Sequence, residues 1–279
     1  MVTPTLHDSG RVLILAISLA MGVAAPPALP QLPCSQGRLP AYAHNDYENR
    51  TPLADALRLG LRGVEADVFL VDGKLRLGHD RREARRRGAD FEATYLAPLS
   101  ALIQRCSGRL TTDGTPFLLT VELKEQSLPT FEALVTVLER YPVFSTTPPD
   151  ALPAIEVVLV GWHPEPETFE ELPVSLAVQY LVTRNATPAD LRPGMRVRLL
   201  SLNYGHVVRR RWRRDVPAAV WQARLAELRR VYPEARVRVF NVPPDARLYR
   251  ELLGAGVELI GTEDVEATTR LLESRGRAQ

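Results

Sequence analysis

The chain has 279 residues, of which 45% are hydrophobic and 24% are charged, as in ordinary soluble globular proteins. Its formal net charge is only +2, so no strong overall field predicts binding to nucleic acid, and we expect none. Nor does any feature of the sequence imply an obligate protein partner.

The first 33 residues are typical of an export signal. Arg11 precedes the apolar run 12–25, and the proline-rich stretch 26–33 follows it. The run is too short to cross a bilayer comfortably, but it suits the hydrophobic region of a signal peptide. We therefore predict a signal and proline-rich segment over residues 1–33 and a secreted or periplasmic domain over residues 34–279. An uncleaved N-terminal membrane anchor is the alternative.

From residue 39 onward, short β-rich runs alternate with helical patterns, which is typical of βαβ units. The predicted strands are Pro40–Ala43, Gly63–Val68, Phe117–Glu122, Glu156–Val160, Ser175–Gln179, Val197–Leu202, Arg236–Phe240 and Val257–Gly261. The predicted helices are Pro52–Leu59, Pro98–Cys106, Thr130–Arg140, Ala218–Tyr232, Ala246–Ala255 and Glu263–Ser274, with weaker patterns near residues 165–171 and 188–193.

These elements predict a single-domain α/β fold, the (β/α)₈ TIM barrel. Eight strands are enough to close a barrel, and the roughly 245 residues that follow the signal segment are the usual length for one. An open doubly wound sheet is the rival architecture. No GxGxxG follows the first strand, so nothing supports a dinucleotide site there.

Cys34 and Cys106 are the only cysteines of the chain. In an exported protein they can form one disulfide, which would tie the mature N-terminus to the barrel. Two free thiols are the alternative.

Polar side chains gather at the ends of the first three predicted strands. His44 follows the first strand, and Glu65 and Asp67 lie two residues apart on the second, so both carboxylates project from the same side of it. Two carboxylates on one side of an apolar strand would repel each other if buried and unpaired. A hard divalent cation, Mg²⁺ or Ca²⁺, prefers oxygen ligands and relieves that repulsion.

The same mouth receives further candidates. Glu122 ends the third strand and supplies another carboxylate, Lys124 brings a positive charge near a bound phosphate, and His79 follows shortly after the second strand. Taken singly, each has a structural interpretation: a hydrogen-bonded strand histidine, Glu65 paired with an arginine, or Glu122 paired with Lys124. Their joint position at the carboxyl ends of the strands, where barrels carry their active sites, favours a functional one.

The motif order H-N, E-x-D, H-D and E-x-K resembles the glycerophosphodiester phosphodiesterase, phosphatidylinositol phospholipase C and sphingomyelinase D-type barrels. It is most similar to the altered-inheritance-of-mitochondria family of phosphodiesterases. The H-N-D-Y, V-E-A-D-V and G-H-D segments of that family stand here at residues 44–47, 64–68 and 78–80. The likeness continues through residues 95–99 and 238–264.

The resemblance implies a role for each motif residue. It places the catalytic histidines at His44 and His79, and the ligands of a divalent cation at Glu65, Asp67 and Glu122. The expected reaction is metal-dependent cleavage of a phosphodiester, glycerophosphodiester or phospholipid-like, by two-histidine acid/base catalysis and through a cyclic phosphate.

Two further residues, Asn45 and Lys124, are expected to bind substrate. Asn45 stands where the glycerophosphodiesterases carry arginine, so a phosphate contact is missing or comes from another residue. This departure weakens glycerophosphodiesters as the specific substrate.

Two arginine runs each allow two interpretations. Arg209–Arg214 follows the sixth predicted strand, and Arg81–Arg87 follows His79. Either run would grip an anionic lipid headgroup or touch a membrane surface peripherally, or it would form a solvated loop or helix start.

Two rival functions stay open. A barrel glycosidase would use Glu65 and Glu122 as its carboxylate pair, and it should survive chelation of metals. A non-catalytic exported binding protein would keep the barrel without turnover.

Overall fold

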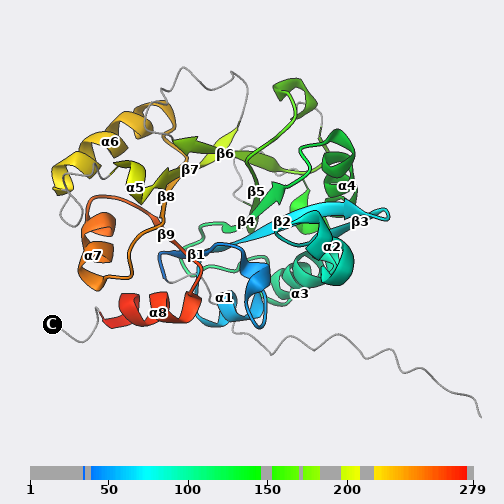
Figure 1. Cartoon of the computed structure of the whole chain (residues 1–279), viewed down its shortest axis with the longest axis horizontal. Coiled ribbons are helices and arrows are strands. Elements are labelled where there is room, and N and C mark those ends of the chain that lie inside the picture. Colours follow the sequence, from blue (N-terminus) through cyan, green and yellow to red (C-terminus); the bar gives the residue numbers. More distant parts are fainter. Residues whose placement is uncertain are drawn as a thin grey trace, which may run out of the picture.

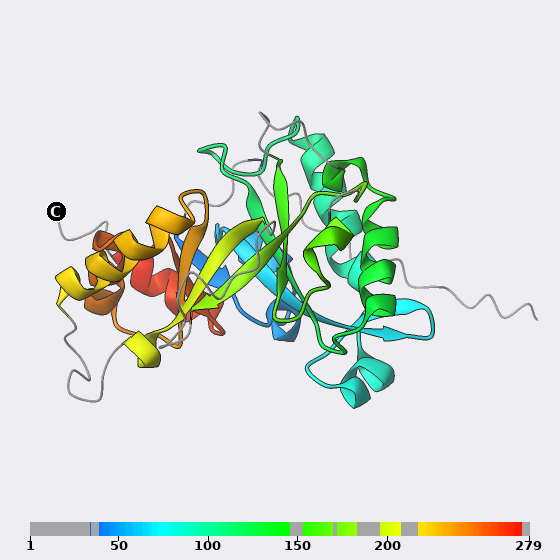
Figure 2. The same cartoon turned by 90° about the horizontal axis from the view of Figure 1, so that it is seen from above.

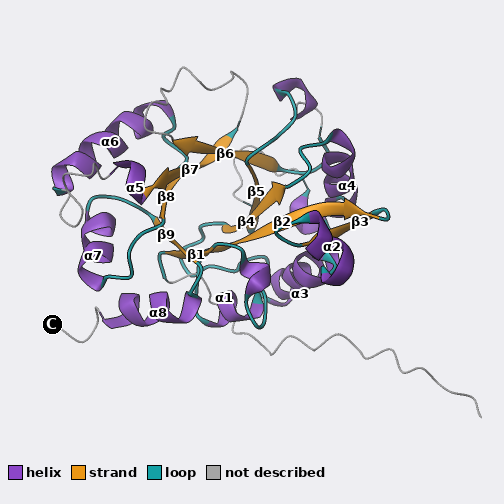
Figure 3. Cartoon of the chain, viewed as in Figure 1, coloured by secondary structure: helices purple, strands orange, loops and turns teal. Residues whose placement is uncertain are grey.

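The computed structural model describes residue 34 and residues 39–145, 153–169, 172–182, 196–207 and 217–274. Within these ranges, parallel strands form a closed ring with helices around its outside (Figures 1 and 3). The strands of the ring are β1 (Ala41–Ala43), β2 (Gly63–Val71), β4 (Phe117–Leu123), β5 (Ile155–Val160), β6 (Leu176–Val182), β7 (Val197–Asn203), β8 (Arg236–Phe240) and β9 (Leu259–Thr262).

Strand β1 closes the ring. It pairs in parallel with β9 through Ala41 and Ile260 on one side, and with β2 through Ala43 and Val64 on the other. The remaining strands of the ring pair in chain order, each parallel to the next. The predicted (β/α)₈ barrel is therefore confirmed.

Helices cover the outer face of the ring. They are α1 (Ala54–Arg58), α2 (Arg81–Arg87), α3 (Ala97–Arg105), α4 (Leu128–Leu138), α5 (Tyr204–Val207), α6 (Ala218–Val231), α7 (Ala246–Gly254) and α8 (Val265–Glu273). Figure 2 shows α6, α7 and α8 on one side of the strands and α2, α3 and α4 on the other. The weak pattern near 165–171 is a short 3₁₀ turn, Pro166–Phe169, and the one near 188–193 lies outside the described residues.

Alternation along the strands divides the barrel into two environments. In β2, Val64, Ala66 and Val68 pack against the helices, whereas Glu65 and Asp67 take the opposite, inner face. The lower interior is filled by a separate apolar cluster, made of Tyr42, Leu118, Val158, Ala177, Leu199 and Leu259. The polar interior residues of β2 and β4 stand above it, toward the carboxyl ends of the strands.

The sequence prediction missed several short elements in the described part of the chain, among them α5 and a hairpin after β2, and it ended the second strand at Val68. The strand continues to Val71 and turns back as β3 (Lys74–Leu77), antiparallel to β2. Asp72 and Gly73 form the turn with φ of 49° and 75°. An Asp-Gly pair at positive φ is a strong signal for a two-residue hairpin, so the local sequence already carried this feature.

A disulfide joins Cys34 to Cys106, which follows the last residue of α3; the alternative of two free thiols is wrong. Within the described ranges, no helix has both the length and the apolar character needed to cross a membrane. The predicted signal segment, residues 1–33, lies outside those ranges.

Candidate active site

Three carboxylates meet at the mouth of the barrel. Asp67 of β2 stands directly opposite Glu122 of β4 in the parallel register, and Glu65 lies two residues before Asp67 on the same face. Each of the three offers one oxygen to a group of atoms that all lie within 4.8 Å of one another. The side chains of Glu65 and Asp67 are 2% and 1% exposed, whereas Glu122 is about one-third exposed. The structure thus brings together the three residues predicted as metal ligands.

Burial and mutual repulsion perturb these carboxylates. Burial raises the pKa of Asp67, and the nearby Glu65 charge adds to this against the opposing effect of Lys124. Burial also raises the pKa of Glu122, helped by the charge of Asp67. Burial alone would raise the pKa of Glu65 as well, but Arg238 and His44 outweigh it and hold that pKa below its ordinary value. Glu65 is therefore the carboxylate whose charge the protein itself neutralises best.

Lys124 lies beside the other two carboxylates. Its Nζ is 3.3 Å from Asp67 Oδ2 and 3.3 Å from Glu122 Oε1. Burial alone would lower the pKa of Lys124, but the two carboxylates outweigh that effect and raise it, so its ammonium stays charged. A fixed positive charge at this place suits contact with an anionic phosphate.

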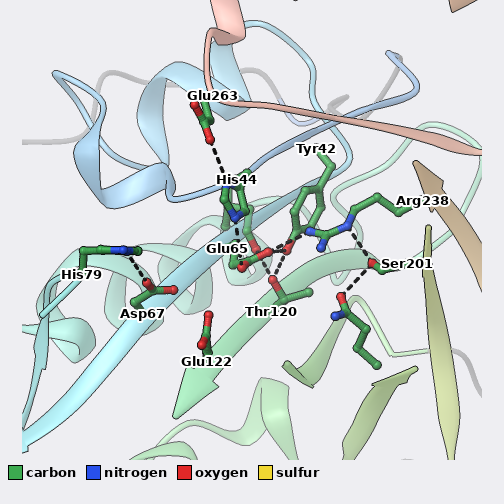
Figure 4. Close-up of polar contacts among 12 residues, drawn as sticks. Tyr42, His44, Glu65, Asp67, His79, Thr120, Glu122, Ser201, Arg238 and Glu263 are labelled. Carbon is green, nitrogen blue, oxygen red and sulfur yellow. Dashed lines mark hydrogen bonds and ion pairs between the residues drawn. The ribbon is translucent and has the colours of Figure 1, made fainter. Parts of the chain in front are cut away.

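The two predicted histidines flank the carboxylates (Figure 4). His44 Nε2 lies 3.7 Å from Glu65 Oε1, and its Nδ1 lies 3.3 Å from the exposed Glu263 Oε1. His79 Nδ1 lies 3.4 Å from Asp67 Oδ2. His44 is one-third exposed and His79 nearly two-thirds, so solvent reaches both rings.

The β2–β3 hairpin explains the position of His79. Antiparallel pairing sets Leu77 opposite Val68, and the Gly78 amide donates to the carbonyl oxygen of Asp67. The next residue, His79, therefore returns to the mouth beside Asp67. The motif containing His79 was visible in the sequence, but the hairpin that returns it to the carboxylates was not predicted.

Two aspartates beside the histidines have structural contacts. Asp46 is fully buried and accepts hydrogen bonds from the Leu53 amide at 2.6 Å and the Tyr95 hydroxyl at 2.9 Å. Asp80 caps α2 by accepting from the Glu83 amide. Both therefore serve as loop or helix caps.

Sequence reasoning missed the residues beneath the carboxylates. Tyr42 and Arg238 both donate to Glu65 Oε2 at 2.7 Å, and Tyr47 donates to Asp67 Oδ2 at 3.0 Å. The available signal was alternation: in Arg236–Phe240 the first, third and fifth residues share one face of the strand, which makes Arg238 a charged residue at an interior position.

The donor set fits a divalent cation. Asp67 Oδ1 is buried and has no hydrogen-bond partner among the described residues, and Figure 4 shows it pointing into the cluster. A buried carboxylate oxygen without a donor is costly unless a ligand or ion completes it. All three residues offer carboxylate oxygens, which hard cations such as Mg²⁺ and Ca²⁺ prefer.

The other predicted contacts are distributed around this centre. Asn45 is half-buried in a left-handed backbone conformation (φ 48°, ψ 46°) directly after His44. The run Arg81–Arg87 forms the helix α2, where Arg81 pairs with Glu125 and Arg87 with Glu83. The run Arg209–Arg214 lies outside the described residues.

A pocket of about 370 Å³ adjoins His44. It opens between the segments that follow β8 and β9, and its wall combines apolar and polar side chains, among them Phe240, Asn241, Tyr249 and Thr262. Asn241 therefore lines the pocket, whereas the Asn203 side chain, after β7, accepts a hydrogen bond from the Gly205 amide.

Comparisons with known proteins agree with this architecture. Residues 37–115 match the profile of the AIM6-like phosphodiesterase domain family. Altered inheritance of mitochondria protein 6 of Eremothecium gossypii is 32% identical over 89 residues, which are 31% of this chain and 23% of that protein. The same protein of Kluyveromyces lactis is 33% identical over 69 residues, 24% of this chain and 16% of that protein. The matched region thus spans less than a quarter of these curated relatives.

The fold has a neighbour among solved structures. The crystal structure of a glycerophosphodiester phosphodiesterase from Parabacteroides distasonis aligns with a TM-score of 0.52 at 17% identity, covering 85% of this chain and 98% of that one. At this identity the match concerns the fold alone. Together, the profile match, the two relatives and the shared fold confirm the resemblance of this chain to the phosphodiesterase-barrel superfamily that the motifs predicted.

Proposed function

We propose that the protein is a metal-dependent phosphodiesterase that cleaves its substrate with His44 and His79. The observation that carries the proposal is the position of the two histidines, each beside a different carboxylate of one three-carboxylate cluster. The family profile over residues 37–115 supports the same reaction class.

The cluster of Glu65, Asp67 and Glu122 would hold Mg²⁺ or Ca²⁺. When bound, the cation would polarise a non-bridging phosphoryl oxygen and offset negative charge that develops in the transition state. Lys124, held beside Asp67 and Glu122, would attract a second phosphoryl oxygen. Asn45, next to His44, would offer an amide to the substrate in place of the arginine of the glycerophosphodiesterases.

The imidazoles of His44 and His79 would carry out acid/base catalysis. One would accept the proton of the attacking hydroxyl, and the other would donate a proton to the leaving oxygen. The Glu65 carboxylate beside His44 and the Asp67 carboxylate beside His79 would stabilise each ring when it is protonated. An adjacent hydroxyl of the substrate as nucleophile would give a cyclic phosphate, and water would give a monoester, so ³¹P NMR of the product separates the two.

The glycosidase alternative depends on Glu65, and the contacts of Glu65 argue against it. Glu65 is 2% exposed, and its Oε2 already accepts from Arg238 and Tyr42. A carboxylate held in this way has little freedom to attack a sugar, and its lowered pKa makes it a poor general acid.

The test is hydrolysis of bis(p-nitrophenyl) phosphate and of a small lysophospholipid panel, with and without EDTA. Each histidine should contribute about 100-fold to 10,000-fold, so His44→Ala and His79→Ala should lose at least about 100-fold in kcat. His206→Ala is the matched control, because His206 is an exposed histidine on α5 that forms no ion pair with a carboxylate among the described residues. Chelation should abolish turnover, and Mg²⁺ or Ca²⁺ should restore it. Turnover that survives both EDTA and the loss of His44 would overturn the proposal.

A further inference from the structure

A chain of hydrogen-bonded side chains runs beneath the carboxylate cluster. Arg238 Nη1 donates to Glu65 Oε2 at 2.7 Å, and its Nε donates to Ser201 Oγ at 2.8 Å. Ser201 Oγ in turn donates to Gln179 Oε1 at 2.9 Å. Figure 4 shows this chain crossing the barrel interior from β8 to β2, with the Tyr42 ring beside the guanidinium. Gln179, Ser201 and Arg238 lie on the neighbouring strands β6, β7 and β8, whereas Glu65 lies on β2, which is not paired with β8 in the closed ring.

The chain fixes the orientation of Arg238. Its side chain is 4% exposed, and its guanidinium carbon lies 4.5 Å from the centre of the Tyr42 ring. Stacking on an aromatic face and hydrogen bonds from two different nitrogens leave the guanidinium little freedom. Arg238 is therefore held with Nη1 directed at Glu65.

The consequence for Glu65 is that its two oxygens differ. Oε2 accepts from both Arg238 and the Tyr42 hydroxyl, at 2.7 Å each. Oε1 instead faces His44 at the mouth. Binding a cation through both oxygens would break one or both of these buried hydrogen bonds, so Glu65 can supply one oxygen without loss.

The two carboxylate oxygens of Asp67 differ in the same way. Its Oδ2 contacts the Tyr47 hydroxyl at 3.0 Å and the Lys124 ammonium at 3.3 Å, whereas its buried Oδ1 has no hydrogen-bond partner in the described part of the chain. Both buried carboxylates are thus arranged to give one oxygen each.

We propose that Arg238, together with the Tyr42 hydroxyl, is a positioning residue that restricts Glu65 to a single ligand oxygen and so makes the site select Mg²⁺ over Ca²⁺. The proposal rests on the metal site of the proposed function and names the ion that it takes. Mg²⁺ binds near-octahedrally, keeps several waters and uses few carboxylate oxygens. Ca²⁺ takes more oxygen ligands and often binds carboxylates through both oxygens, which the hydrogen bonds to Oε2 oppose.

If the role of Arg238 were only structural or electrostatic, a different effect on the two metal affinities would be expected. Removing its positive charge would strengthen the attraction for every divalent cation, and Mg²⁺ and Ca²⁺ carry the same charge. A charge effect therefore changes both affinities in parallel and leaves their ratio unchanged. Release of Glu65 Oε2 favours the ion that uses two oxygens, and so it changes the ratio.

The experiment is isothermal titration of the purified full chain with MgCl₂ and with CaCl₂ separately, which needs no turnover. Arg238→Met removes the hydrogen bond together with the charge, and Tyr42→Phe removes the second hydrogen bond to Oε2 at constant charge. The matched control is Arg198→Met, because Arg198 pairs with the buried Glu156 at 2.9 Å near the opposite ends of the strands. Circular dichroism checks that each variant folds. If Arg238→Met does not fold, Tyr42→Phe still tests the proposal.

We expect the wild type to prefer Mg²⁺, and both site variants to lose about 10-fold of that preference, which is the lower end of what the loss of an outer-shell partner costs in metal affinity. Arg198→Met should keep the wild-type ratio. If the ratio of Mg²⁺ to Ca²⁺ affinity is unchanged in Tyr42→Phe and Arg238→Met, while the wild type still binds Mg²⁺, the selectivity role of Arg238 is overturned but the proposed function is not. A wild type that prefers Ca²⁺ would also overturn that role. A wild type that binds neither ion would overturn the proposed function as well.

Discussion

Asp46 offers a test of how the loop after β1 is held. It is fully buried between the Leu53 amide and the Tyr95 hydroxyl, and this loop carries His44 and Tyr47 into the site. Burial raises the pKa of Asp46 from an ordinary 3.8 to about 6, although the hydrogen bonds it accepts oppose the change. At about 1.4 kcal/mol per pKa unit, this difference corresponds to about 3 kcal/mol of folding free energy.

The direction of the pH dependence of stability follows from the raised pKa of Asp46. Between pH 3.8 and about 6 the folded chain holds a proton on Asp46 that the unfolded chain has released. The stabilisation from Asp46 is therefore complete below pH 3.8 and is lost as the pH rises through about 6. Asp46→Asn has no such proton, so the difference in unfolding free energy between wild type and variant should fall with pH. About 2 kcal/mol of the fall should occur between about pH 4.5 and 7.5.

Urea unfolding followed by circular dichroism at several pH values measures this difference. Asp113→Asn is the control of opposite sign. Hydrogen bonds from Thr115 and Arg62 outweigh burial at Asp113 and hold its pKa well below the ordinary value. Its stabilisation is present at higher pH and lost only as the pH falls, so no fall is expected over the same range. A wild-type minus Asp46→Asn difference that stays flat or rises with pH would refute the reasoning.

Two further predictions concern packing and the cation. In Gly63→Ala the added methyl would lie 2.7 Å from Leu118 Cβ, so overpacking should lower the unfolding free energy by about 1–3 kcal/mol, measured by thermal unfolding. Gly254→Ala, whose methyl meets nothing within 4 Å, is the control; equal effects of the two changes would contradict the packing argument. At Mg²⁺ about 100-fold above its Kd, the wild type should gain about 2.7 kcal/mol of stability. Glu122→Gln should lose most of that gain in the same assay, and an undiminished gain would exclude Glu122 as a ligand.

The barrel itself was readable from the sequence because its signals are local. Apolar strands alternated with amphipathic helices, and the predicted strand Arg236–Phe240 has the observed bounds. The helix predicted over Thr130–Arg140 is observed as α4, Leu128–Leu138, whose N-cap Ser127 accepts a hydrogen bond from the Thr130 amide. The hairpin at Asp72–Gly73 had an equally local signal, and β3 alternates charged and apolar residues, but it has only four residues and was not predicted.

The carboxylates and histidines were predictable for a related reason. Alternation along one strand sets Glu65 and Asp67 on one face, and parallel strands deliver their carboxyl ends to one mouth. Once a barrel is assumed, Glu122 and His44 follow at that mouth without knowledge of any distance.

The partners of these residues required the tertiary structure. Arg238 stands 173 residues after Glu65, and only closure of the ring brings β8 across the interior from β2. The sequence allowed Glu65 to pair with some arginine but could not choose among the many arginines of the chain, because the choice depends on which strand faces β2 inside the ring. The pairing of Cys34 with Cys106 was left open for the same reason, since it depends on an approach of 5.1 Å between Cα atoms 72 residues apart in sequence. Periodicity fixes which way a side chain faces, whereas its partner across the barrel depends on how all the strands close together.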